Sequence, residues 1–460
     1  MNGVMWAKVT FTSSFWKKER LLALISNPRA LVGGVADYVR GKKPLRWTAP
    51  ESSHILTELL EEMPLKAKLA AGVSNSLVKY WVGSNGVGKI LLDRANKLNA
   101  LTHDMSISLL EQLDRWKNDS TVKAVLIEGA GQKAFCAGGD ITESANQVGT
   151  NDPKLFAQMV DDFSEEFAVN HLVATFPKPY ISIIDGICMG GGVGVSIHGP
   201  FRIATERTKV AMPETRIGFF CDVGSSFFLS KIGGNLGRYL ALTSDTLDGY
   251  DNLLTGVATH YIESKNLESL YTELNSLQLN GNEKENYQEI KAALDKCCRS
   301  TTPDSYVFKF GGEKAKIIDT CFGRQRVEEI VMNLQATKSD RSFVESTLRT
   351  LNERSPTSLK ITLELLNRAK NDDWTIKKAL IQDASLSKVI LQLPDYVEGV
   401  NARLISKPPR KPNWSPSDIP SVSDKSIAEI FQQIDTDVVP VKFRTDTDYN
   451  QYPWGFSDKN

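Results

Sequence analysis

Two glycine-rich segments, each following an apolar run, constrain the fold of this chain more than any other feature. The first is KAFCAGGD (133–140), which follows KAVLIEGAG, and the second is GICMGGGVG (186–194), which begins in PYISIIDG. Small residues where a strand gives way to a helix leave backbone N–H groups uncovered at the helix start. Each segment is therefore predicted to join a buried strand to a helix and to leave main-chain donors open to a bound group.

Short apolar runs alternate with helical patterns through the middle of the chain. KYWVGSNGVGKILLDR (79–94) has two β-favouring runs around Asn85-Gly86, a dipeptide typical of tight hairpin turns. Thr102 precedes apolar residues at helical spacing and is expected to cap a helix. FRIAT (201–205) adds a further strand. Strands that alternate with helices predict an α/β fold with largely covered sheets.

The composition changes along the chain and suggests five segments. LQLNGNEKENYQEI (277–290) is polar and weakly patterned, and KPPRKPNWSPSDIPSVSD (407–424) is rich in Pro, Ser and Asp. Between them the pattern is helical, with Ser355-Pro356 arranged as a helix start. We expect a basic extension and connector (1–75), a core (76–270), a polar excursion (271–310), a C-terminal helical region (311–405) and an extended tail (406–460).

Composition also excludes several classes of protein. Hydrophobic residues make up 41% and charged residues 24% of the 460 residues, which is typical of a globular protein. No run approaches the roughly 18 apolar residues of a membrane span, so no membrane association is expected. The six cysteines show no CxxC pairing, which argues against a disulfide framework and against a zinc site. We expect no metal site.

The first fifty residues differ in charge from the rest. They hold nine lysines and arginines against two acids, Glu19 and Asp37, a net charge of +7, although the whole chain is neutral. Three interpretations fit this segment: a mitochondrial transit peptide, a solvated basic arm, or an extension that contacts nucleic acid.

The paired glycine turns suggest a specific chemistry. A single turn of this kind is often a simple connection, and phosphate binding is an alternative, but neither segment matches G-x-x-x-x-G-K-[ST]. Two separated N–H donors that converge on one oxygen form an oxyanion hole, which stabilises a thioester carbonyl as it gains charge.

The motifs KAFCAGGDI, MGGGVG, FRIATE, AMPE and IGFFCDVG, in this order, resemble the crotonase (enoyl-CoA hydratase/isomerase) superfamily, and within it the 3-hydroxyisobutyryl-CoA hydrolase branch. The resemblance covers about residues 78–405. It implies a spiral of ββα repeats that forms two sheets, with an acyl-CoA as substrate. By position in the motifs, it implies that Ala137 and Gly191 donate the two N–H groups of the oxyanion hole.

The resemblance also implies which acids act. Hydratases of this superfamily carry a second glutamate three residues after the middle glycine, and here that position is Gly194. The hydrolase branch instead pairs the glutamate after proline with an aspartate eight residues on, and this chain supplies Glu214 and Asp222 as the catalytic pair. Further substrate contacts are expected from Glu166, at the hydroxyl end of the substrate, and from Gly138, Gly139, Asp140 and Gly190.

Two functions of different classes follow from the resemblance. The first is a mitochondrial matrix hydrolase that converts 3-hydroxyisobutyryl-CoA to 3-hydroxyisobutyrate and CoA in valine breakdown, with no cofactor beyond the CoA of its substrate. The second is a hydrolase-like subunit of the mitochondrial small ribosomal subunit, with ribosomal RNA and proteins as partners. The acids and glycines favour the enzyme, whereas the basic arm, the long tail and the replacement of an acidic-aromatic-Arg element by Gln382, Asp383 and Ala384 favour the ribosomal subunit. The oligomeric state cannot be read from the sequence.

Overall fold

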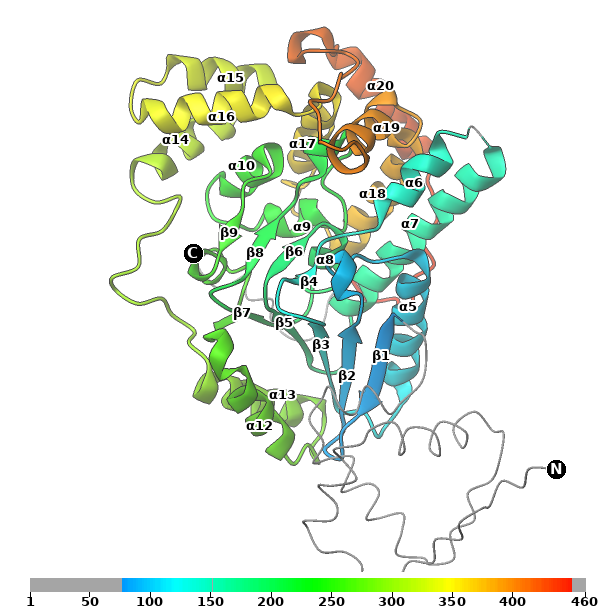
Figure 1. Ribbon diagram of the computed structural model, residues 1–460, viewed down its shortest axis with the longest axis vertical. Coiled ribbons are helices and arrows are strands. Elements are labelled where there is room, and N and C mark those ends of the chain that lie inside the picture. The colour runs from blue at the N-terminus through cyan, green and yellow to red at the C-terminus, as the bar shows by residue number, and fades with distance from the viewer. Residues whose placement is uncertain (1–76, 151, 449–460) are drawn as a thin grey trace, which may run out of the picture. The chain divides into compact units, whose positions relative to one another are not determined.

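The computed structural model describes residues 77–150 and 152–448, and expectations for the basic extension lie outside this range. The described chain forms two sheets (Figure 1). The larger has strands in the order β1 (Val78–Val82), β2 (Val87–Leu92), β3 (Ala124–Gly129), β5 (Tyr180–Ile184), β7 (Phe201–Ala204) and β10 (His260–Tyr261). The smaller has β4 (Ala134–Cys136), β6 (Ile187–Met189), β8 (Lys209–Ala211) and β9 (Leu247–Asp248).

Successive strands alternate between the two sheets. β3, β5 and β7 pair in parallel in the larger sheet, while the strands that follow each of them, β4, β6 and β8, pair in parallel in the smaller one. The predicted hairpin is present as the antiparallel pair β1–β2. This arrangement confirms the predicted α/β class and the spiral of ββα repeats.

Both faces of the larger sheet are buried, as the apolar runs predicted. Val125 and Ile127 point into a cluster shared with α5 (His103–Asn118) and α7 (Pro153–Ala174). Leu126, on the other face, belongs to a second cluster. Alternate residues of a strand point to opposite faces, so the run Ala124–Ile127 of β3 is apolar at every position. The expected cap is confirmed, since Thr102 Oγ1 accepts a hydrogen bond from Met105 N at 3.3 Å.

The second face is covered by the segment that was expected to be a polar excursion. Residues 271–310 contain the end of α12 (Leu267–Ser276) and all of α13 (Glu283–Cys297), which Figure 1 shows side by side. Leu270 and Leu274 of α12 and Ile290 and Leu294 of α13 complete the cluster beneath the sheet. Their spacing of four residues was hidden by the charged residues on the outer sides of both helices.

The C-terminal part is helical, and the segment after residue 405 departs from the extended tail that was expected. Within the described residues its last helix is α20 (Asp424–Thr436), which buries Ile427, Phe431 and Ile434. Arg368, at the end of α17 (Pro356–Arg368), pairs with Asp435 of α20 at 2.7 Å. Apolar residues three and four apart give this helix a face that packs on the domain. The other helices of this part are α14 (Glu313–Phe322), α15 (Val327–Ala336), α16 (Arg341–Glu353), α17 (Pro356–Arg368), α18 (Ile376–Ile390) and α19 (Pro394–Val400).

Short helices fill the connections and continue some of the longer helices. They are η1 (Ala95–Lys97), α6 (Ile141–Val148), α8 (Gly191–Gly194), η2 (Glu214–Ile217), α9 (Ser225–Leu229), α10 (Leu236–Thr243), α11 (Tyr250–Leu254), η3 (Ser264–Asn266), the π-helical turn η4 (Asn401–Ile405) and η5 (Ile419–Ser421). Across the residues that the structure describes, no helix combines the length and apolar character needed to cross a bilayer.

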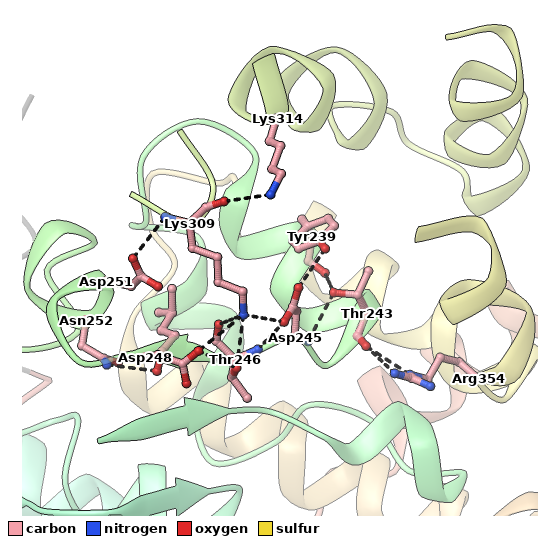
Figure 2. A network of polar contacts seen from close by, with 11 residues as sticks. Tyr239, Thr243, Asp245, Thr246, Asp248, Asp251, Asn252, Lys309, Lys314 and Arg354 are labelled. Carbon is pink, nitrogen blue, oxygen red and sulfur yellow. Dashed lines mark hydrogen bonds and ion pairs between the residues drawn. The ribbon is translucent and has the colours of Figure 1, made fainter. Parts of the chain in front are cut away.

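Polar contacts fasten the C-terminal helices to the spiral (Figure 2). Lys309 Nζ, in the connection to α14, bonds Asp245 Oδ1 at 2.9 Å and Thr246 O at 2.8 Å, just after α10. At the end of α16, the Arg354 guanidinium donates twice to Thr243 O, at 2.5 and 3.2 Å. The helices that follow are therefore held in a defined position above the smaller sheet.

Candidate active site

The two glycine-rich turns and the predicted acids meet at one cavity of about 130 Å³. Parallel strands of the smaller sheet end at the same edge, so β4 and β6 bring their turns together. Side chains from α7, η2 and α19 close the remaining sides. The lining includes Ala137, Gly138, Gly139, Asp140, Glu166, Gly190, Gly191, Glu214, Asp222 and Tyr396, and thus every predicted site residue.

The uncovered N–H groups belong to Gly139 and Gly191. A Cβ atom on Gly191 would lie 3.3 Å from Gly139 N, so the two turns approach closely. Within the described chain neither N–H has a hydrogen-bond acceptor. The expectation for Ala137 is wrong, because its N–H donates to Leu98 O at 3.0 Å and is not available to a substrate. Gly139, two residues on, replaces it in the pair of donors.

Close packing explains why this edge is built from glycine. A Cβ on Gly191 would lie 2.3 Å from Glu166 Oε1, and one on Gly190, which has φ +48°, would lie 2.8 Å from Glu214 Oε1. Both distances are below van der Waals contact, so a side chain would displace the carboxylates. The absent Cβ atoms therefore let two acids reach the main-chain donors.

The structure also explains why Gly194 carries no second glutamate. A Cβ there would lie 2.7 Å from Asn170 Nδ2 and 2.8 Å from Val223 Cβ. The position is filled by its neighbours, and a larger side chain would displace the turn that follows Asp222. The cavity therefore lacks the second acid of the hydratases at this place.

The carboxylates that face the cavity are poorly hydrated. Glu214 and Asp222 are each 6% exposed, and Glu214 Oε2 is buried without a hydrogen-bond partner. Burial, and then the Glu166 charge, raise the pKa of Glu214 to about 8. Burial alone raises the pKa of Glu166 to about 7. Burial and the neighbouring acids raise the pKa of Asp222 well above its ordinary value. The described lining contains no lysine or arginine, so no cation there offsets these shifts, and Glu166 and Glu214 exchange protons near neutral pH.

The turn that carries Asp222 is held from outside by two side chains that were given no site role from the sequence. Val223 and Gly224 have left-handed backbone, with φ of +51° and +74°. His198 Nε2 hydrogen-bonds Val223 O at 2.7 Å, and Asp383 Oδ2 of α18 accepts from Gly224 N at 2.7 Å. A β-branched residue at positive φ is strained and persists only where its surroundings fix it.

Of these two side chains, Asp383 is the one that the sequence reasoning should have considered for the site. It is 0% exposed, its Oδ1 has no hydrogen-bond partner, and its charge is one of those that raise the pKa of Asp222. An aspartate between buried Leu380 and Leu386 on one helix was the signal that could have revealed it. The sequence showed Asp383 only as a departure from the family pattern.

Other polar residues at the cavity have structural partners. Asp140 accepts hydrogen bonds from Arg94 at 2.7 Å and from Thr142 at 2.7 Å, so its carboxylate steadies the first glycine turn. At the rim, His103, Asp162 and Glu165 bring potential metal ligands within 4.8 Å of one another, all of them partly exposed. His103 Nδ1 lies 3.2 Å from Asp162 Oδ1. The expectation of no metal site therefore stays a prediction.

Such a cavity is suited to acyl transfer from a thioester. Two backbone donors can hold a carbonyl oxygen as it becomes an oxyanion, and a carboxylate with a raised pKa can take a proton from water beside it. The typical ligand pocket has about 300–1,000 Å³, so this smaller cavity fits an acyl end rather than a whole CoA.

Comparisons with known proteins agree with this geometry. Residues 87–431 match the family model described as enoyl-CoA hydratase/isomerase. The chain is 39% identical to the mitochondrial 3-hydroxyisobutyryl-CoA hydrolase of Danio rerio, over 77% of this chain and 88% of the relative. The Homo sapiens hydrolase is also 39% identical, over 75% and 86%.

A relative of another kind is somewhat less identical over a comparable length of this chain. Small ribosomal subunit protein mS47 of Neurospora crassa is 36% identical, over 79% of this chain and 73% of the relative. Among solved structures, a carnitinyl-CoA dehydratase from Mycobacterium thermoresistibile superimposes with a TM-score of 0.69 at 32% identity, covering 80% of this chain and 98% of that one. With matches of this extent, the resemblance noted in the motifs is confirmed, and the chain belongs to the enoyl-CoA hydratase/isomerase family.

Proposed function

We propose that this protein hydrolyses a short β-hydroxyacyl-CoA thioester, namely 3-hydroxyisobutyryl-CoA, to 3-hydroxyisobutyrate and CoA. One observation carries the proposal: the paired N–H groups of Gly139 and Gly191 lie beside Glu214, whose buried Oε2 lacks a hydrogen-bond partner. The choice of 3-hydroxyisobutyryl as the acyl group rests on the names of the Danio rerio and Homo sapiens relatives.

In the proposed reaction the thioester oxygen accepts hydrogen bonds from Gly139 N and Gly191 N. Glu214 takes a proton from water, and the hydroxide attacks the carbonyl carbon to form a tetrahedral intermediate whose oxyanion stays on the two donors. The C–S bond then breaks, and the thiolate of CoA receives the proton that Glu214 had taken. Direct attack by the Glu214 carboxylate, followed by hydrolysis of the anhydride, gives the same products.

The other acids support this sequence of steps. The Glu214 charge is one of the causes that raise the pKa of Asp222. Two buried carboxylates near each other cannot both ionise easily, so the pair can carry one proton between them during the reaction. Glu166, beside Gly191, has a pKa near neutrality and can stay protonated while the oxyanion forms. The proposal invokes no metal or cofactor beyond the CoA of the substrate. The mitochondrial names of the relatives support a place in the mitochondrion, and we propose the matrix.

The test is the release of CoA from 3-hydroxyisobutyryl-CoA by the purified chain, measured with a thiol reagent. Crotonyl-CoA, assayed in parallel, is expected to be hydrated poorly because Gly194 stands in place of the second acid. Efficient hydration of crotonyl-CoA without CoA release would overturn the proposal.

A second candidate function is a role in the mitochondrial small ribosomal subunit, favoured by the similarity to mS47. Such a role predicts that the native protein sediments with small-subunit RNA in a glycerol gradient. Sedimentation only as a free protein would exclude it. The two functions do not exclude each other, because every residue proposed to act in hydrolysis lies between residues 139 and 222, outside the basic first fifty.

A further inference from the structure

We propose that the Tyr396 hydroxyl binds the hydroxyl group of the acyl chain and thereby selects β-hydroxyacyl thioesters over unsubstituted ones. This inference rests on the proposed function and deepens it. Nothing in the family motifs pointed to Tyr396, which lies in α19, about 180 residues beyond the catalytic glutamate.

The Tyr396 side chain is buried but its hydroxyl is unsatisfied. Tyr396 is 0% exposed, it lines the cavity that holds Glu214 and Asp222, and its hydroxyl has no hydrogen-bond partner of good geometry. Buried tyrosine hydroxyls normally find a partner, and one left without it destabilises the fold. A hydroxyl that is kept unsatisfied at the wall of an active cavity indicates a place for a polar group of the ligand.

The neighbours of the hydroxyl place it beside Asp222, within the cavity. Ser144 and Asp222 are the polar groups that act on it. The rest of this wall is apolar, from Ile141, Phe163 and Phe219. An acyl chain that carried a hydroxyl would therefore meet a buried phenol whose hydrogen-bonding capacity is not used up by Ser144 or Asp222, beside the apolar side chains of this lining.

The backbone around Tyr396 is fixed tightly enough to discriminate between ligands. A Cβ on Gly218, next to η2, would lie 2.0 Å from Asp395 O, and one on Gly399 would lie 2.3 Å from Ile217. The Tyr396 ring packs against Phe219 with centroids 5.5 Å apart. The segment that carries Glu214 and the helix that carries Tyr396 are therefore in direct main-chain contact.

Two side-chain contacts fix the same helix from its other side. The Asp395 carboxylate accepts hydrogen bonds from Ser355 Oγ at 2.6 Å and from Ser415 N at 2.7 Å. Ser355 caps α17, and its own N–H donates to Thr215 O of η2 at 3.1 Å. Because this network links α19, α17 and η2, the phenol cannot easily move to find another partner when the substrate lacks a hydroxyl.

The energetic consequence is selectivity. A site that hydrogen-bonds a substrate hydroxyl disfavours the analogue without it, because the buried protein group then stays unpaired. Removing the phenol oxygen should abolish that preference. A purely structural role for the hydroxyl predicts instead a loss of stability and no change in preference.

The test uses Tyr396→Phe, which removes one oxygen, in a Glu214→Gln background that does not turn over substrate. The dissociation constants of 3-hydroxyisobutyryl-CoA and isobutyryl-CoA are measured by calorimetry, since these thioesters differ only in the hydroxyl. We expect the preference for the hydroxylated thioester to fall about tenfold, as for one lost hydrogen bond. Melting temperature should change little, because Ser144 is the one described side chain that approaches the hydroxyl as a hydrogen-bonding neighbour and the contact lacks good geometry.

Tyr180→Phe is the matched control. Tyr180 is also 0% exposed, but its hydroxyl donates to Val195 O at 3.1 Å and lies outside the cavity, so this change should lower stability and leave the preference intact. An unchanged preference in Tyr396→Phe, or equal weakening for both thioesters, would refute the inference. If the preference falls as expected but the wild-type chain hydrolyses neither thioester, the proposed hydrolysis fails and the binding role of Tyr396 stands.

Discussion

Replacing Glu214 by glutamine should abolish hydrolysis and stabilise the fold above neutral pH. Burial and neighbouring negative charge raise the pKa of Glu214 from 4.5 to about 8. A carboxyl group with a raised folded-state pKa contributes stability that is full below its unfolded pKa and is lost as pH rises toward the folded pKa. The rise corresponds to roughly 5 kcal/mol at pH 8 and above, as an order of magnitude, and to no difference near pH 4.

The amide has the shape of the protonated acid and cannot ionise, so it avoids this loss. Urea unfolding of both proteins at pH 5, 7 and 8 should show a stability gap that widens with pH in favour of Glu214→Gln. Wild-type kcat/KM should rise with an apparent pKa near 8, since the base must be ionised. If Glu214→Gln is less stable than wild type at all three pH values, Glu214 has a structural role. If the variant still hydrolyses the thioester, Glu214 is not the catalytic base.

Three further changes test other parts of the site. Gly191→Ala, whose Cβ would lie 2.3 Å from Glu166 Oε1, should lower kcat by about 100-fold or more, as for a lost oxyanion donor, and unchanged turnover would mean that the carbonyl binds elsewhere. Asp383→Asn retains an acceptor for Gly224 N but removes a charge that raises the pKa of Asp222. The pH profile of kcat should therefore shift to lower pH. A profile that does not move would show that Asp383 acts only through packing. A chain that begins at Ser52 should retain its thioesterase rate but lose salt-sensitive binding to ribosomal RNA, and loss of the rate in a folded truncated protein would contradict the placement of the site.

The sequence predicted the parts of the fold that depend on local pattern. The hairpin at Asn85-Gly86, the cap at Thr102 and the helix start at Ser355-Pro356 are all present, because turns and caps are set by adjacent residues. The burial of both faces of the larger sheet was predicted from its continuous apolar strands. Residues 271–310 were expected to be a surface helix or an excursion, and they contain helices; their contribution to the core was missed because charged residues on the outer side of an amphipathic helix hide its apolar face. The extended tail was expected for the same reason, and there the structure has α20.

The site was predicted as far as the motifs reach. Glu214, Asp222, Glu166 and Gly191 line one cavity, as expected. The choice of Ala137 failed because position in a motif does not tell which way a backbone N–H points; the hydrogen bond to Leu98 O reveals it. Asp383 and Tyr396 were missed for a different reason. Tyr396 reaches the cavity, and Asp383 reaches the turn after Asp222, from helices far along the chain. No local pattern connects α18 or α19 with that turn.

The buried acids of this cavity lower the stability of the fold, and catalysis explains why the cavity contains them. Glu166, Glu214 and Asp222 are acids whose ionisation is opposed by burial, and the described cavity lining offers them no lysine or arginine. Apolar or amide side chains of similar size at these positions would relieve the repulsion and stabilise the fold. A chain that serves only as a scaffold gains nothing from such a cluster, whereas a hydrolase needs carboxylates that bind and release protons near neutral pH beside two oxyanion donors. The same reasoning applies to the Tyr396 hydroxyl. Without a hydrogen-bond partner of good geometry it lowers the stability of the folded protein, whereas in a cavity that binds a hydroxylated acyl group it strengthens binding.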